Sequence, residues 1–468
     1  MRKNFLAAIT AALAAVLLAW LPAPAETVSW TAIRGARIVP VNGPVIEKGT
    51  VLIRNGVIAA VGSQVDVPAS AWIVDGNGLT VYPGLIDALS TWGLPQAAQA
   101  PAQTAGRGAQ QLPQLPQQQQ PQQPQAQQPQ ARSRGPQDRP GTFTWVKAAD
   151  QVQSSDSRLA SARNAGFTTA VTFPRQGIVA GHGAIINLGG KTAGEMVVLP
   201  EAGLYLALRP SGYTGFPSTP MGIMAYFRQL WLDADHYRQA LALYAADPVN
   251  IPRPAYDRAL EGLMGVKRVL LPAPDPIQME RMVKLAADLK TPAVLYGVVR
   301  GYEMAERLKA TGTPVILNVR WPAREPGADP EQEESYRELR IRDLAPTSPA
   351  ALSAAGVKWA VSSDGLETPR AVLRALKQSI DRGLRREDAL RALTLSAAEI
   401  YGVADRLGSI EPGKAANLVV ATGDLFDDST RVRMVFIDGV RYLPEPELPQ
   451  PPAGAPGRGP SSEKGEEQ

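Results

Sequence analysis

The sequence predicts an α/β protein built on a (β/α)8 TIM-type barrel, with a small β domain made from both ends of the chain. Two observations predict this architecture. Strand-like and helix-like patterns alternate through the middle of the chain, which is typical of a parallel sheet whose strands are connected by helices. Two hairpin signatures of the same kind stand far apart, near the two ends. The 468 residues are enough for one large barrel and an accessory domain.

Each hairpin signature is a two-residue turn between apolar runs. Asn55 and Gly56 form the turn within TVLIRNGVIAAVG, and Asp438 and Gly439 form it within RMVFIDGVRYL. These residue pairs favour the tight hairpin turn in which both central residues have positive φ. We therefore expect residues 26–82 and 408–445 to supply the strands of one shared β domain.

The barrel is predicted from the pattern of residues 83–407. Its predicted strands include GFTTAVTF, VKRVLLPA, TPAVLYG, TPVILNV and VKWAVSSDG. The segment DPIQMERMVKLAADLK is a predicted helix, because apolar residues recur at three- and four-residue spacing. These apolar residues are Met279, Met282, Val283, Ala286 and Leu289. A second helix is predicted in TPRAVLRALKQSIDRG, with Thr368 as its cap, Pro369 at its first position and Gly383 as its stop.

The first 25 residues are predicted to be a signal peptide. Arg2 and Lys3 precede the apolar run 5–21, and residues 23–25 fit a small-x-small cleavage site. The alternative is an uncleaved membrane anchor, but the run is shorter than the about 20 residues that a membrane span requires. We expect a periplasmic or secreted protein without membrane attachment after cleavage.

Composition excludes several classes of function. The chain has no cysteine, which excludes disulfides, thiolate metal sites and cysteine nucleophiles. The net charge is +4, and lysines and arginines are scattered through the chain. The basic residues form no stripe along the sequence, so we expect no nucleic-acid partner.

Two segments are predicted to be disordered. Residues 94–141 are rich in proline and glutamine and almost free of apolar residues, so they cannot bury enough surface to offset their chain entropy. The tail 446–468 is rich in proline and glycine. Because the insert follows VYPGLIDALSTWG directly, we expect it to leave the barrel at the carboxyl ends of the strands.

Four segments resemble the amidohydrolase superfamily, especially its imidazolonepropionase-like members. They are KGTVLIRNGVIAAVG, VYPGLIDA, GFTTAVT and TLSAAEIYGVADRLGSIEPGKAANLVV. The resemblance implies a barrel joined to a β-sandwich that both chain ends build. It also implies an ancestral reaction in which a divalent metal such as zinc activates water for attack on the C–N bond of an amide or cyclic amide.

The resemblance further implies where metal ligands would stand. Members of the family use a His-x-His pair after the first strand, histidines ending the fifth and sixth strands, and an aspartate ending the eighth. The corresponding positions in this chain are Leu89, Thr91, Pro272, Tyr296 and Asp364. Four histidines are required, and the whole chain has two. We therefore predict no metal cofactor, and we expect these positions to line a pocket at the barrel mouth.

The two histidines and two aspartates lead to separate expectations. His182 lies between two glycines and is expected to be an exposed loop residue, whereas His236 is expected on the surface or half-buried in a helix. Asp364, in VSSDG, is the one candidate catalytic residue. The alternative is that Asp364 has only a structural role, as a capping residue in a turn. Asp87 is expected to serve the fold.

The sequence leaves three functions open. The leading interpretation is an exported pseudoenzyme without metal, which binds a small molecule at the barrel mouth or supports a partner. The second is a hydrolase of non-peptide C–N bonds that uses a non-standard site around Asp364. The third is a structural subunit that pairs with an active amidohydrolase relative.

Overall fold

The structure is a computed structural model that describes residues 29–95, 138–210, 215–324, 327, 329, 331 and 333–445. Its strands form two separate eight-stranded sheets. The predicted signal peptide, most of the proline- and glutamine-rich insert and the tail lie outside the described residues. Both ends of the predicted insert are described, and they pack against the barrel. Leu94 is buried, and Arg139 forms ion pairs with Asp233 and Asp257.

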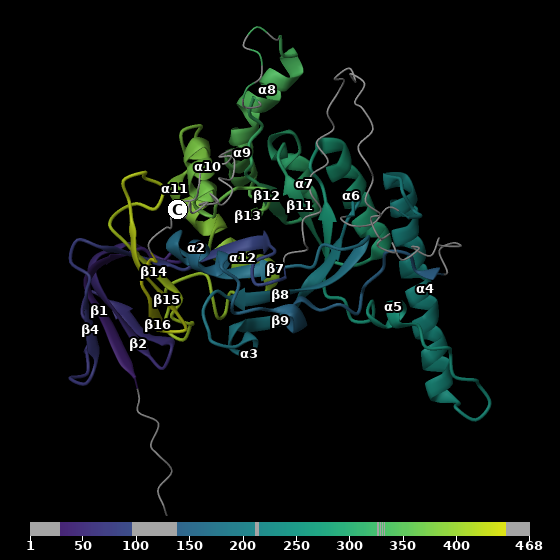
Figure 1. The fold of residues 1–468 in the computed structure, drawn as a ribbon, viewed down its shortest axis with the longest axis horizontal. Coiled ribbons are helices and arrows are strands. Elements are labelled where there is room, and N and C mark those ends of the chain that lie inside the picture. Colours follow the sequence, from purple (N-terminus) through teal and green to yellow (C-terminus); the bar gives the residue numbers. More distant parts are fainter. Residues whose placement is uncertain are drawn as a thin grey trace, which may run out of the picture.

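One sheet forms a nearly closed barrel (Figure 1). In order its strands are β6 (Leu85–Ser90), β7 (Phe167–Thr172), β8 (Val179–Asn187), β9 (Val197–Leu206), β10 (Val269–Pro272), β11 (Ala293–Val298), β12 (Val315–Asn318) and β13 (Trp359–Ser362). The two outer strands, β6 and β13, lie close together. The Ser362 hydroxyl of β13 donates a 3.0 Å hydrogen bond to the Leu89 carbonyl of β6. The predicted strand segments around β7 and β10 to β13 are all confirmed.

The barrel departs from the all-parallel arrangement that was predicted. Strand β8 runs antiparallel to both β7 and β9, while β10 to β13 pair in parallel. The reason is the short connection 173–178 between β7 and β8. A parallel partner requires a crossover of a dozen or more residues, so a short link returns the chain antiparallel.

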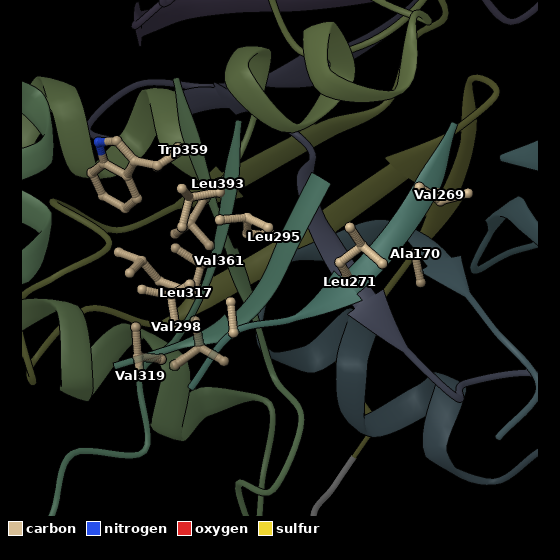
Figure 2. Packing of buried hydrophobic residues seen from close by; sticks show 14 of the residues in the cluster. Ala170, Val269, Leu271, Leu295, Val298, Leu317, Val319, Trp359, Val361 and Leu393 are labelled. Carbon is tan, nitrogen blue, oxygen red and sulfur yellow. The ribbon is translucent and has the colours of Figure 1, made fainter. Parts of the chain in front are cut away.

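Alternate residues of the parallel strands face opposite sides of the barrel wall. Those facing the barrel interior include Leu270, Val294, Ile316 and Ala360. Those facing the surrounding helices, shown in Figure 2, include Val269, Leu271, Leu295, Leu317 and Val361. Both faces are apolar because a parallel sheet is covered on both sides. The barrel interior is therefore packed with side chains.

The helices surround the barrel and connect its strands. They are α2 (Arg158–Asn164), α3 (Ala193–Met196), α4 (Pro220–Ala246), α5 (Arg258–Glu261), α6 (Pro276–Leu289), α7 (Ala305–Thr311), α8 (Tyr336–Leu344), α9 (Ser348–Ala355), α10 (Arg370–Ile380), α11 (Arg386–Ala392) and α12 (Leu395–Tyr401). Short 3-10 helices are η2 (Ala148–Gln151), η3 (Gly301–Glu303) and η4 (Ala345–Thr347). Within the described ranges, no helix combines the length and the apolar character that a membrane span needs.

The two helices predicted in detail differ in outcome. Helix α6 is confirmed: Asp275 caps it, and Met279, Met282, Val283 and Leu289 are buried. Helix α10 begins one residue later than predicted, and Pro369 occupies its cap position without a side-chain hydrogen bond. The predicted cap at Thr368 is wrong, because Pro369 occupies the cap position and Thr368 takes part only through its backbone carbonyl, which accepts from the N–H of Ala371.

The second sheet joins the two ends of the described chain (Figure 1, purple and yellow). Its strands are β1 (Trp30–Ile38), β2 (Ile46–Arg54), β3 (Val57–Gly62), β4 (Trp72–Asp75), β5 (Thr80–Pro83), β14 (Leu418–Ala421), β15 (Val432–Ile437) and β16 (Val440–Tyr442). The ends meet where β5 pairs with β14 in antiparallel register.

Both predicted hairpin turns are confirmed. Asn55 and Gly56 connect β2 to β3 with φ of 48° and 81°, and Asp438 and Gly439 connect β15 to β16 with φ of 48° and 75°. Asparagine, aspartate and glycine are the residues that adopt positive φ at least cost. These local choices fix the register of each hairpin.

Candidate functional site

The five positions named from the sequence lie at or near the carboxyl ends of barrel strands, and of these five only Thr91 and Asp364 line the cavity described below. Leu89 and Thr91 lie at the carboxyl end of β6, Pro272 ends β10, Tyr296 lies near the end of β11, and Asp364 follows β13. This is the end at which barrel enzymes hold their active sites. The side chains differ in exposure: Leu89 is 1% exposed and Tyr296 is 8% exposed, whereas Asp364 is half-buried.

Aromatic side chains fill the barrel interior below this end. The rings of Tyr205 and Tyr296 stack with centroids 4.8 Å apart, and Phe173 lies 5.9 Å from Tyr205. The hydroxyl of Tyr296 donates to the Leu206 carbonyl at 2.9 Å. Buried tyrosines normally find such a partner. The position that the resemblance gave to a histidine of the sixth strand is therefore part of a packed aromatic layer.

An arginine that the sequence analysis missed lies at the centre of the site. Arg175 follows β7, and its Nη2 lies 3.2 Å from Oδ2 of Asp364. Its Nη1 donates to the hydroxyl of Tyr205, and its Cζ lies 4.6 Å from the centroid of the Tyr205 ring. The arginine side chain is 22% exposed. A charged residue two positions after the predicted strand GFTTAVTF was the signal that could have found it.

The charge of Arg175 is held in place by its neighbours. Burial acts to lower the pKa of the guanidinium, but the nearby Tyr205 and Asp364 oxygens outweigh burial and raise that pKa above its ordinary value. The side chain is therefore a fixed cation in the working pH range. It forms a salt bridge with the one carboxylate that the sequence predicted to be catalytic.

A second carboxylate, Asp87, is fully enclosed between the first and last strands of the barrel. It is 1% exposed, and it accepts hydrogen bonds from the backbone N–H of Leu89 at 3.2 Å and of Ser363 at 3.1 Å. The hydroxyl of Ser363 donates to its other oxygen. Burial raises the pKa of Asp87 to about 7, and the hydrogen bonds only partly offset that effect. Asp87 thus joins β6 to the segment after β13, in keeping with a role in the fold.

A cavity of about 380 Å³ opens beside these groups. Serine and threonine side chains make up much of its wall, from the end of β6, from α2 and from the segment after β13. The charged side chains in the wall are Arg158, Asp364 and Glu367. Arg158 is paired with Asp156 at 2.7 Å and donates to the Thr91 hydroxyl at 3.1 Å. The cavity therefore offers mainly hydroxyl groups and carboxylates to a ligand.

The residues at this end do not fit the divalent metal that the resemblance implies. Zinc in proteins is held by imidazole, thiolate and carboxylate groups, and the five positions supply leucine, threonine, proline, tyrosine and one aspartate. The guanidinium of Arg175 already contacts that aspartate. Across the part of the chain that the structure describes, no three His, Cys, Asp or Glu residues are grouped closely enough to hold a metal.

The two histidines lie away from the mouth residues. His182 belongs to β8, is 7% exposed, and its Nε2 lies 3.0 Å from the Gly262 carbonyl. The prediction of an exposed loop residue is wrong, because the glycines on either side allow β8 to pass close to its neighbours. A Cβ on Gly183 would lie 2.2 Å from the Phe173 ring. His236 is exposed on α4, as predicted.

Comparisons with known proteins agree with this architecture. Residues 305–441 match the model of the Amidohydrolase family. A crystal structure of an amidohydrolase from Thermotoga maritima MSB8 is similar with a TM-score of 0.68 and 25% identity, over 88% of this chain and 99% of that chain. Another amidohydrolase structure is similar in fold alone, with a TM-score of 0.50 and 15% identity over 90% of this chain and 100% of that chain. No curated protein matches the sequence.

The matched segment contains the last two barrel strands, β12 and β13, and from the second sheet β14, β15 and the beginning of β16. It therefore includes Asp364 and the return of the chain to β5. The chain carries the signature of the amidohydrolase family over residues 305–441 and has the fold of solved amidohydrolases.

Proposed function

We propose that this chain is a ligand-binding protein on the amidohydrolase fold, in which an ion pair takes the place of a metal centre. The observation that carries the proposal is the contact of 3.2 Å between Arg175 and Asp364. A fixed cation already balances the one carboxylate that the resemblance would give to a metal. A divalent ion at the same oxygen would be repelled by the guanidinium, and a half-buried site would screen that repulsion only in part.

The cavity at the barrel mouth supports binding of a small polar molecule. Its wall carries the hydroxyls of Ser90, Thr91 and Ser161 beside the carboxylates of Asp364 and Glu367. Hydroxyls donate or accept, and carboxylates accept. A ligand with several hydroxyl or amine donors would satisfy this wall, and pockets of this size enclose small molecules.

The first test is metal binding, read by elemental analysis and by melting temperature. We expect less than one Zn, Mn, Fe or Ni per chain in the purified protein. An ion that binds only the folded state would raise the melting temperature. We therefore expect no rise on adding excess Zn²⁺. Asp364→Asn should behave in the same way. A stoichiometric metal, or a stabilisation by Zn²⁺ that Asp364→Asn abolishes, would overturn the proposal.

A hydrolase with a non-standard site is the second candidate, and one contact favours it. The hydroxyl of Ser363 lines the cavity and donates to the carboxylate of Asp87. A hydroxyl bonded to a carboxylate is one arrangement by which serine becomes a nucleophile. With a pKa of about 7, Asp87 is partly ionised at neutral pH and can accept a proton.

Hydrolysis assays distinguish the two candidates. Under the leading proposal, the native protein hydrolyses no cyclic amide, amide or dipeptide. Under the second, hydrolysis is measurable and Ser363→Ala reduces it by about 10² or more. Ser161→Ala is the matched control. Ser161 lines the same cavity, but Asp87 accepts its described hydrogen bonds from Leu89 and Ser363 and not from Ser161. Activity that only Ser363→Ala removes would establish the hydrolase.

A further inference from the structure

A second, larger cleft lies beside the barrel mouth, between the segment that follows β12 and the side of α10. It encloses about 720 Å³, and its wall contains five arginines. These are Arg320, Arg324, Arg342, Arg374 and Arg382. Leu366 separates this cleft from the cavity described above, because it lines both. The cleft is therefore adjacent to the barrel mouth but distinct from the Arg175–Asp364 site.

The positive charge of the cleft is only partly balanced. Arg342 is paired with Glu334, and Arg382 lies 2.7 Å from a carboxylate oxygen of Asp343. The one carboxylate in the wall, Asp381, accepts from Lys377 through both oxygens, at 2.7 and 3.0 Å.

Two arginines of the cleft carry excess charge. Arg320 and Arg374 are exposed, and neither forms an ion pair with a carboxylate among the described residues. They come from different walls, since Arg320 follows β12 and Arg374 lies on α10. Arg320 lies against Gly365, where an added Cβ would be 3.6 Å from its Cδ. Within the described ranges, the cleft thus presents two guanidinium groups that no carboxylate neutralises, from separate elements.

The location of the cleft in the barrel and the tryptophan in its wall indicate which kind of anion it would bind. Barrels of this class frequently hold phosphate groups between the loops after the seventh and eighth strands and a helix N-terminus. In this barrel those strands are β12 and β13, and the cleft runs along α10 from Ala371 in its first turn. Trp321 forms part of the wall, and its indole N–H is fixed by a 3.0 Å hydrogen bond to the Ala375 carbonyl.

We propose that this cleft binds a small molecule carrying a phosphate monoester, with the apolar part of the ligand packed against Trp321. A phosphate monoester carries about −1.5 to −2 charge at neutral pH, which two unpaired guanidinium groups match. Arginine presents its donors in a planar fork that suits phosphate oxygens. A monocarboxylate would leave one of the two guanidinium groups without a counter-charge.

The test is calorimetric titration of the full chain at low ionic strength with phenyl phosphate, inorganic phosphate and benzoate. We expect one site for phenyl phosphate, with an affinity at least about tenfold higher than that of benzoate, because each charge-assisted contact contributes on this scale. Inorganic phosphate should bind more weakly than phenyl phosphate, since it makes no contact with Trp321. Raising the salt concentration should weaken phenyl phosphate binding.

Variants locate the site and control for charge. Arg320→Gln and Arg374→Gln should each weaken phenyl phosphate binding by about tenfold. Both side chains are exposed and form no ion pair with a described carboxylate, so unchanged melting temperatures are expected. Arg433→Gln makes the same charge change at an exposed position of β15 and should leave binding intact. Absence of binding, equal binding of benzoate, or an equal loss in Arg433→Gln would each overturn the proposal.

Discussion

Arg175 and Asp364 meet because β7 and the eighth strand of the barrel end at the same face. Their mutual attraction contributes modestly to stability, since the Asp364 side chain is 45% exposed and solvent screens it. Their larger effect is on what the site can hold. A guanidinium is a permanent cation with donors only. By pairing with the Asp364 carboxylate, it opposes both metal binding and proton uptake by that carboxylate.

Asp87 shows the opposite balance at the same end of the barrel, where burial dominates. Its folded-state pKa is raised from 3.8 to about 7. Between these two pH values the folded state therefore binds more protons than the unfolded state. The contribution of Asp87 to stability is fully present below about pH 4 and is lost as the pH rises through about 7.

We therefore predict that the free energy of unfolding falls between pH 5 and pH 8, and that Asp87→Asn removes most of this fall. Asparagine stays neutral and keeps an oxygen for the N–H groups of Leu89 and Ser363. At about 1.4 kcal/mol per pH unit, the two units between pH 5 and the folded-state pKa of about 7 correspond to a fall of no more than about 3 kcal/mol. Urea unfolding of both proteins at pH 5, 6.5 and 8 measures the difference. Parallel pH profiles would show that Asp87 ionises normally in the folded state.

At the scale of elements, the two hairpins that the sequence predicts come into direct contact. A Cβ on Gly56 would lie 2.6 Å from the Asp438 carbonyl, and a Cβ on Gly439 would lie 2.8 Å from the Cα of Gly56. Glycine is thus required twice at each turn, once for its positive φ and once for the close approach of two backbones. The turns from opposite ends of the chain help to hold the second sheet together.

We predict that Gly439→Ala lowers the free energy of unfolding by about 2–4 kcal/mol, because both requirements are violated. The control is Gly78→Ala. Gly78 has nearly the same φ, 74° against 75°, but a Cβ there has nothing within 4 Å. It should cost only about 1 kcal/mol, the expense of positive φ alone. Equal losses for the two variants in urea unfolding would mean that the contact between the turns is unimportant.

At the scale of the whole molecule, a buried polar network connects the barrel to the second sheet. The Asn187 side chain, at the end of β8, donates to Asp438 at 2.7 Å and accepts from Thr169 at 3.0 Å and Asn417 at 2.9 Å. The Asp438 backbone N–H donates to the Asn417 side chain at 2.8 Å. Asn187 in the barrel bonds to Asn417 and Asp438 beside the second sheet, so the barrel and the second sheet are positioned by the same hydrogen bonds.

We predict that Asn187→Ala lowers the free energy of unfolding by about 1–3 kcal/mol, because it leaves buried partners without hydrogen bonds. Asn250→Ala is the matched control, since Asn250 is exposed and bonds only to Asp247 nearby. Its effect should stay within about 0.5 kcal/mol. Urea unfolding followed by circular dichroism provides the measurement. A change no larger than that of Asn250→Ala would show that water replaces the network without cost.

Most of the fold could be predicted because its determinants are local. The hairpins at Asn55-Gly56 and Asp438-Gly439 depend on residues that tolerate positive φ, and helix α6 depends on an apolar period and on Asp275 as its cap. Strand β8 itself was missed because the glycines on either side of His182 favour a loop, and its antiparallel direction follows from the short connection 173–178. Direction is decided by which neighbours the strand reaches.

The sequence alone determined the count of histidines, the apolar and hydroxyl residues at the ligand positions, and the location of Asp364 after a barrel strand. Only the tertiary structure placed Arg175 against Asp364 and buried His182 within β8. Arg175 and Asp364 are far apart along the chain, and the residues around each of them do not predict the pairing. Burial and charge pairing depend on contacts between distant segments, so these features of the site follow from closure of the barrel.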